Sequence, residues 1–176
     1  TEIYTLSLHD ALPISCVMPV RVVHPVITST EIVRLDPAGG EVLSTRTWRW
    51  KRTVYNVFDE LVRAPLIVAS PNVRFDVVMV GIREVRVRDG SKSWRKRGDR
   101  VLSRDLVSVE ATHRLDTPAD WLAMLGTADE PYDSLAVGTA LGIAPVAARK
   151  MLYTYGKAGL LVPAGMNGRR KLYLRG

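Results

Sequence analysis

Cysteine, histidine and long apolar runs are scarce in this chain of 176 residues, and each scarcity excludes a class of protein. The single cysteine, Cys16, can form neither an intrachain disulfide nor a cysteine-rich zinc site, so a reducing cytoplasm is the expected location. The three histidines, at positions 9, 24 and 113, lack the spacing of metal ligands. No segment approaches the roughly 18 consecutive apolar residues of a membrane span, so no membrane partner is expected.

The usual sequence signatures of enzymes are also missing. There is no Gly-rich phosphate loop, no Gly-x-Ser-x-Gly motif and no Cys/His nucleophile pair. The remaining candidates for chemistry are three carboxylates, Glu60, Asp76 and Glu84. With Arg86 they loosely resemble the restriction-endonuclease type of nuclease, in which acidic residues and a Glu-x-Lys hold Mg²⁺ and activate water. Arg86 stays protonated and cannot replace that lysine as a base. Solvated charges on a sheet explain the same residues, and no other cofactor is expected.

Acidic residues are absent from the end of the chain. From Arg149 onward there are seven basic residues and no acidic one, whereas residues 115–133 hold five acidic residues and no Lys or Arg. The net charge is +7 and the pI is about 9.9, which favours a polyanionic partner. A second basic segment, residues 83–100, has eight basic residues against three acidic ones. Its loop, with Arg95, Lys96 and Arg97 beside Trp94, is expected either to contact a polyanion or to be a solvated loop.

The first fifteen residues have a different character from the rest. Residues 5–14, TLSLHDALPI, are the translation of a common short-read sequencing adapter, and Ser15 fits the junction codon. Residues 1–15 are therefore expected to be an assembly artefact rather than native chain, with a genuine strand and turn as the alternative. In the first case the native protein begins upstream, and the strand-rich part that follows is truncated at its N-terminus.

The middle of the chain is rich in β-branched residues and predicts strands. The composition favours strands over 18–26, 73–87 and 101–113, and a hairpin of 31–35 with 41–45 around Asp36–Gly40. Residues 54–62 have the spacing of one short amphipathic helix. The sequence therefore predicts an α+β protein whose first domain, residues 16–114, is a strand-rich antiparallel or mixed sheet with one helix.

One segment of this region alternates cations and aromatic rings: Arg46-Thr47-Trp48-Arg49-Trp50-Lys51-Arg52. On a strand, the period of two places Arg46, Trp48 and Trp50 on one face. Interleaved rings and cations are typical of surfaces that bind single-stranded nucleic acid, because rings stack on bases while cations meet phosphates. The alternative interpretation is a strand anchored by tryptophan with a solvated basic face.

The last sixty residues predict three helices. Thr117 as N-cap, Pro118 and Asp120 mark the start of the first helix. A second helix begins at Ser134, with an expected apolar stripe of Leu135, Ala136, Ala140 and Leu141, and ends at Gly142. Pro145 begins the third helix. We expect the third helix to turn Ala147, Ala148, Met151 and Leu152 inward, and Arg149, Lys150, Thr154 and Lys157 toward solvent.

A hairpin follows these helices, with Leu160–Val162 as a strand, Gly165–Gly168 as its turn and Arg169–Leu174 as the returning strand. With LGIAP at the turn between helices and KAGLL after the third, residues 115–176 resemble the winged helix-turn-helix DNA-binding domain. The resemblance implies a recognition helix over Ala144–Tyr155 and a wing over Asn167–Lys171. The order of the two domains is similar to that of uncharacterised bacterial proteins, from which no function can be carried over.

The resemblance implies a noncatalytic protein that binds nucleic acid, with double-stranded DNA expected, in the manner of a transcription regulator. The expected contact residues are Arg149, Lys150, Thr154, Lys157, Asn167, Arg169, Arg170 and Lys171. Few side chains on the recognition helix could read bases, which favours binding led by the phosphate backbone. Two alternatives stay open: a metal-dependent nuclease targeted by the winged helix, and a winged helix that docks protein in a larger assembly. The oligomeric state is open as well, a homodimer included.

Overall fold

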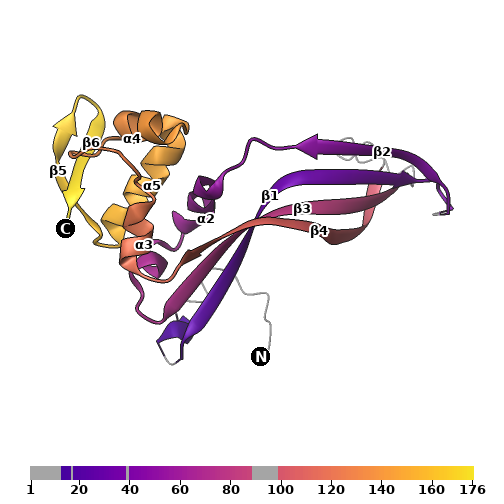
Figure 1. Cartoon of the computed structure of the whole chain (residues 1–176), viewed down its shortest axis with the longest axis horizontal. Coiled ribbons are helices and arrows are strands. Elements are labelled where there is room, and N and C mark those ends of the chain that lie inside the picture. The colour runs from indigo at the N-terminus through magenta and orange to yellow at the C-terminus, as the bar shows by residue number, and fades with distance from the viewer. Residues whose placement is uncertain (1–12, 17, 39, 89–98) are drawn as a thin grey trace. The chain divides into compact units, whose positions relative to one another are not determined.

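A computed structural model describes residues 13–16, 18–38, 40–88 and 99–176. The chain is an α+β protein in which a strand-rich region precedes the principal helices, as the composition predicts (Figure 1). Six strands are assigned: β1 (Val20–Leu35), β2 (Val42–Arg49), β3 (Val73–Arg88), β4 (Asp99–Leu115), β5 (Leu161–Asn167) and β6 (Arg170–Arg175). The helical elements are η1 (Val54–Val57), α2 (Phe58–Leu61), η2 (Pro65–Ala69), α3 (Pro118–Ala123), α4 (Ser134–Leu141) and α5 (Pro145–Lys157).

The four long strands form one mixed sheet in the order β2-β1-β3-β4 (Figure 1). β1 and β2 are antiparallel, which confirms the expected hairpin. Between β1 and β3 the interacting residues keep a constant separation of 52, as in Thr28 with Val80 and Glu31 with Arg83, so these strands run in the same direction. β4 returns antiparallel to β3, since Ser108 lies opposite Gly81 while Arg104 bonds Glu84.

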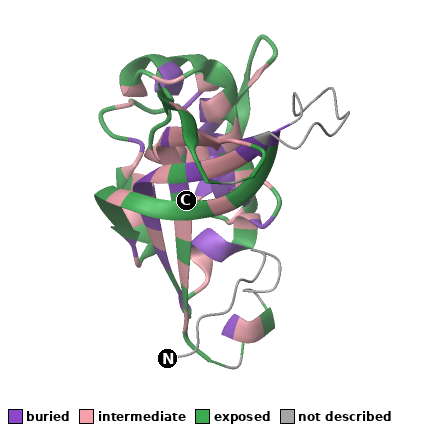
Figure 2. Cartoon of the chain, turned by 90° about the vertical axis from the view of Figure 1, so that its right-hand side faces the viewer, coloured by how far each residue is buried: buried purple, intermediate pink, exposed green. Residues whose placement is uncertain are grey.

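Several local expectations need correction. One continuous strand, β1, replaces the two expected over 18–26 and 31–35, and β3 runs through Gly81. The helix expected over 54–62 is a 3₁₀ turn followed by the four-residue α2. The apolar residues of β4 are mostly exposed, and because exposed residues such as Val101, Leu102, Leu106 and Val107 alternate in direction, both faces of this strand are open over much of its length. The exposed stretches of β2 and β4 are green in Figure 2.

The chain divides into two compact units, and this division differs from the expected boundary at 114/115. Unit 1 holds Thr1–His24, Val54–Val77 and His113–Gly176, and unit 2 holds Pro25–Thr53 and Val78–Thr112. The strands β1, β3 and β4 each contribute residues to both units. The C-terminal helices therefore belong to the same compact unit as part of the strand-rich region.

The core of unit 1 is built on aromatic rings from four elements. The Phe58 ring on α2 meets those of Tyr155 on α5 and Trp121 on α3 edge-on, at centroid distances of 5.5 and 6.2 Å. Trp121 in turn meets Phe75 of β3 at 5.4 Å. The Tyr155 hydroxyl donates a hydrogen bond to the Trp121 carbonyl, which satisfies its polar end inside the core. This cluster fixes α5 against the rest of the unit.

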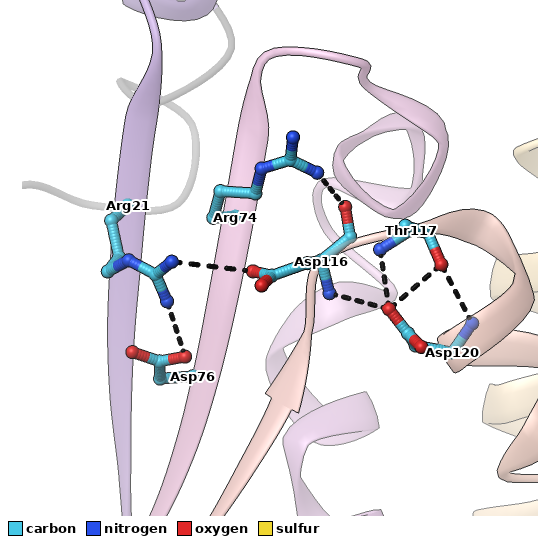
Figure 3. A network of polar contacts seen from close by, with 6 residues as sticks. All are labelled: Arg21, Arg74, Asp76, Asp116, Thr117 and Asp120. Atoms are coloured by element: carbon cyan, nitrogen blue, oxygen red, sulfur yellow. Dashed lines mark hydrogen bonds and ion pairs between the residues drawn. The ribbon is translucent and has the colours of Figure 1, made fainter.

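The junction between β4 and α3 is a polar network in unit 1 (Figure 3). Thr117 is the N-cap of α3, and its hydroxyl accepts from the Asp120 backbone at 3.2 Å while the Asp120 carboxylate accepts from the Thr117 backbone at 2.8 Å. This is the predicted capping box. Arg21 of β1 reaches Asp76 at 2.8 Å and Asp116 at 3.6 Å, and Arg74 of β3 donates to the Asp116 carbonyl. Two strands are thereby tied to the start of the helical segment.

Helices α4 and α5 meet at a sharp turn. Gly142 caps α4 in the left-handed conformation (φ 63°), and the direction of the chain changes by 114° before α5 begins at Pro145. The expected stripe on α4 is wrong: Leu135, Ala136 and Ala140 are exposed, and Val137 and Gly138 are buried instead. Among the described residues no single helix could cross a membrane by length and composition, although α4 and α5 together pass that test as a bent pair.

Strands β5 and β6 form an antiparallel hairpin that packs on α5 (Figure 1). Its turn is Gly168-Arg169, not Gly165–Gly168 as expected, and Gly165 lies at an irregularity in the pairing. Gly168 has a φ of 60°, which a two-residue hairpin turn of this kind requires. Tyr132 pairs with Tyr173 through two backbone hydrogen bonds of 2.8 and 3.0 Å, which adds a third short segment beside β6.

Candidate nucleic-acid interface

A groove of about 440 Å³ lies within unit 1, between α5 and the β5–β6 hairpin. Its floor is partly apolar, with Leu152 of α5 and the Tyr173 ring of β6. Four cations line it, and its described lining includes no carboxylate. The lining residues are Ser134, Arg149, Leu152, Tyr153, Arg169, Arg170, Lys171 and Tyr173. The groove therefore gathers four of the expected contact residues in one place.

Helix α5 positions Arg149 through its periodicity. Ala148, Met151, Leu152 and Tyr155 are buried, as the spacing predicts for the first three, so the opposite face is left to solvent. Arg149 and Tyr153, four residues apart, lie on this exposed side and line the groove. The buried face fixes the orientation of the helix, and the guanidinium of Arg149 is thereby held at the rim.

The hairpin presents the other cations. Arg169 is in the two-residue turn and Lys171 follows on β6, and both are exposed. Gly156 of α5 allows the close approach of the hairpin, because a Cβ at this position would lie 2.8 Å from Cε1 of the Tyr173 ring. The groove is therefore bounded by a hairpin that packs directly on the helix.

Asp133 holds the base of the hairpin to the start of α4. Its Oδ1 caps α4 by accepting from the backbones of Leu135 and Ala136 at 2.7 and 2.9 Å, and its Oδ2 lies 3.4 Å from Nε of Arg170. The backbone bond from Ala136 is the largest of several contacts that lower the pKa of Asp133, to which Arg170 and the Asn167 side chain add. Arg170 and Asn167 of the hairpin are therefore already engaged with Asp133.

Several other cations of the acid-free C-terminal segment are paired with acids from earlier in the chain. Lys150 bonds Asp59 of α2 at 2.7 Å, and Arg175 lies 3.5 Å from Glu130. Lys157 stands 6.0 Å from the centroid of the Tyr153 ring. By contrast, Arg149, Arg169 and Lys171 have no carboxylate partner among the residues that the structure describes. These three are the cations most available to an anion.

The remaining expected contact residues are buried or lie outside the described residues. Thr154 is fully buried and donates to the Lys150 carbonyl at 2.9 Å, so the expectation that it faces solvent is wrong. A hydroxyl that bonds the preceding helical turn needs no water, which is why threonine is tolerated inside. Arg95, Lys96 and Arg97 lie outside the described residues. Tyr153 and Ser134 were missed by the sequence reasoning, since only the packing of the hairpin on α5 brings them to the groove.

The three candidate carboxylates do not form a metal site in the part of the chain that the structure describes, where no cluster of three or more His, Cys, Asp or Glu could hold a metal ion. Asp76 and Glu84 lie eight residues apart on β3, about 26 Å along an extended strand. Asp76 bonds Arg21, Glu60 lies 3.4 Å from Arg63, and Glu84 accepts from Arg86 and Arg104 at 2.6 and 3.0 Å. Arginine pairing accounts for all three.

The fold and the groove define a class: an α+β protein in which a mixed sheet precedes a helix-and-hairpin segment with a basic groove. A family model described as a domain of unknown function, DUF8091, matches residues 12–116. This match covers more than half of the chain, so the protein belongs to the DUF8091 family. The match begins inside the segment expected to be an artefact and ends at the capping box of α3. No curated protein and no solved structure matches the chain.

Proposed function

We propose that this protein binds double-stranded DNA through a winged helix at its C-terminus. The observation that carries the proposal is the basic groove between α5 and the hairpin. In this assignment α3, α4 and α5 are the three helices of the domain, α5 enters the major groove, and the β5–β6 hairpin is the wing.

The arrangement of α4 and α5 supports this assignment. Their 114° turn lies in the range of helix-turn-helix pairs. The Tyr132–Tyr173 bridge supplies the short strand that accompanies the hairpin, between the first and second helices of the segment. The element order is therefore helix, short strand, helix, helix and hairpin, which is the order of a winged helix.

The chemistry of the groove favours contacts to phosphates over contacts to base edges. Guanidinium and ammonium groups line its rim, and Arg149 is the residue of α5 best suited to reach a guanine edge. Contacts to phosphate fix position and carry little sequence information. The protein is thus expected to bind duplexes of different sequence with similar affinity and with strong dependence on salt.

The test is a fluorescence anisotropy titration of a labelled duplex with the whole chain and with a variant that carries Arg149→Ala, Arg169→Ala and Lys171→Ala. We expect the variant to bind about tenfold more weakly or worse, because each lost cation releases one counterion fewer. The slope of log K against log[salt] should fall by about 2 to 3. All three residues are exposed, so the variant is expected to fold.

Arg63→Ala is the matched control, because Arg63 is an exposed arginine of unit 1 that lies outside the groove. It removes a cation and should leave both affinity and slope nearly unchanged. A change in slope per cation removed that is as large in Arg63→Ala as in the groove variant would reduce the binding to net charge. An unchanged affinity in the groove variant would overturn the proposal.

A further inference from the structure

Two tryptophans of unit 2 are exposed on an edge strand. Trp48 on β2 and Trp50, just past its end, are 54% and 49% exposed. Among the described residues β2 pairs only with β1, so its other edge has no partner strand there. Natural edge strands are protected by charged side chains, and large exposed rings do the opposite. Protection of the edge explains the cations of this segment but does not explain its tryptophans.

The two rings lie on the same face of the strand. Thr30 of β1 is the register partner of Trp48. The Trp50 backbone donates to the Thr28 carbonyl at 2.7 Å, which continues the ladder by one residue, and its indole N–H donates to the Thr30 hydroxyl at 3.3 Å. The Cα atoms of residues two apart on a strand are separated by about 7 Å. Both rings are thus held next to Thr30, and each keeps about half of its surface open.

The cations around these rings are available to an anion. Arg46, Arg49, Lys51 and Arg52 are all exposed, and none has a carboxylate partner among the described residues. Within the described part of the chain, Arg52 alone of these four has an aromatic contact, with its guanidinium 5.6 Å from the centroid of the Trp50 ring. Elsewhere in unit 2, Arg34, Arg83, Arg86 and Arg104 are all paired with carboxylates. Within the described part of unit 2, cations without a carboxylate partner are therefore concentrated next to the two tryptophan rings.

We propose that the segment Arg46–Arg52 is a second nucleic-acid site, at which Trp48 and Trp50 each stack on one base of a single strand while the surrounding cations meet its phosphates. Stacking on aromatic rings accepts any base, because every base has a π-face, and the free cations supply the charge complement. Commitment to single-stranded DNA, in place of RNA, rests on the proposed function, which assigns DNA to the groove in unit 1. The stacking surface itself is derived independently of that function.

The test is a titration of labelled oligothymidylate of about 12 nucleotides with the whole chain. Trp48→Ala and Trp50→Ala should each weaken binding about 5- to 100-fold, whereas Trp48→Phe should retain most of the affinity. Leu43→Ala is the control: it removes an equally exposed apolar side chain from the same strand and should change affinity less than about twofold. No binding by the native chain, or an equal loss in Leu43→Ala and Trp48→Ala, would overturn the inference.

Two further arms separate this inference from the proposed function. The groove variant of Arg149, Arg169 and Lys171 should bind oligothymidylate normally, and Trp48→Ala should bind the duplex normally. If the native chain binds the duplex but does not bind oligothymidylate, this inference alone is overturned. If it binds oligothymidylate but does not bind the duplex, the proposed function alone is overturned. Preference for oligouridylate over oligothymidylate would overturn the assignment to DNA.

Discussion

The two compact units differ in how many hydrophobic side chains they bury. Among the described residues, 20 of the 24 buried hydrophobic residues belong to unit 1, including all the rings of its aromatic cluster. Unit 2 has four, Val26, Met79, Val80 and Val87, and exposes nine large hydrophobic side chains on β2, on β4 and at Trp50. Burial of apolar area is the main favourable term in folding. Unit 1 therefore has a conventional core, and unit 2 is a sheet with little of its own to bury.

Among the described residues, both buried carboxylates of unit 2 are held in ion pairs. Arg34 meets Asp99 at 2.8 Å, and Glu84 is held between Arg86 and Arg104. Asp99 and Glu84 are both buried, whereas the arginines that pair with them are partly exposed. The difference teaches that unit 1 depends chiefly on its apolar core, whereas unit 2 has few buried apolar side chains and two buried carboxylates that need arginine partners. Each prediction below changes one unit in a way that the other should tolerate.

The largest expected effect is on the aromatic core of unit 1. Phe58→Ala should lower the free energy of unfolding by about 3 to 5 kcal/mol, since it opens a cavity among Trp121, Tyr155 and their neighbours. Trp48→Ala removes an aromatic ring from the surface of unit 2 and should cost about 0.5 kcal/mol or less. Urea denaturation followed by far-UV circular dichroism measures both. Equal losses of unfolding free energy in Phe58→Ala and Trp48→Ala would contradict the inferred difference in apolar core between the units.

The sequence predicts much of the fold because local chemistry dictates it. The capping box at Thr117, the left-handed Gly142 and Pro145 mark helix ends through short-range bonds, and β-branched runs favour strands. The apolar stripe predicted for α4 is wrong because of a tertiary contact. A Cβ on Gly138 would lie 3.0 Å from the Ile143 carbonyl oxygen, so a glycine marks the close contact and the apolar residues beside it face outward.

The candidate site was only partly predictable for a similar reason. Its cations are visible as an acid-free tail, but their availability depends on partners that are remote in sequence. Lys150 and Asp59 are 91 residues apart, and nothing local predicts their contact. The pairing of Arg170 with Asp133 depends on the hairpin returning to the start of α4. Only the structure separates Arg149, Arg169 and Lys171 from the paired cations.

The second largest effect is expected at Glu84 in unit 2. Burial alone would raise its pKa, but the hydrogen bonds and charges of Arg104 and Arg86 outweigh burial, and the pKa lies below its ordinary value. A lowered native pKa means that the ion pairs stabilise above the ordinary carboxyl pKa of about 4 and lose that contribution as pH falls through the lowered value. Glu84→Gln should cost about 2 kcal/mol at neutral pH and flatten the acid limb of the stability profile.

Urea denaturation at a series of pH values measures the effect of Glu84→Gln. Glu110→Gln is a suitable control, because Glu110 is an exposed carboxylate of β4 in the same unit. A profile for Glu84→Gln that keeps the native acid limb would show that the arginine pairs do not contribute to the stability of unit 2.

The smaller of the two effects expected at carboxylates is at Asp133 in unit 1, whose carboxylate accepts mainly from backbone N–H groups. Asp133→Ala should cost about 1 kcal/mol through loss of the α4 cap. Asp133→Asn should cost less, because asparagine caps equally well. It should also remove the decline in the free energy of unfolding that occurs as pH falls through the lowered pKa of Asp133.

Salt separates the two carboxylates most sharply. A cap formed with neutral N–H groups at close range is screened little, whereas the attraction of Glu84 to partly exposed arginines weakens as salt rises. The cost of Glu84→Gln should therefore fall between about 0.1 and 1 M salt while that of Asp133→Ala stays level. A parallel decline of both costs in denaturation titrations would mean that charge, and not the cap, dominates at Asp133. The expected difference between the carboxylates of the two units would then be absent.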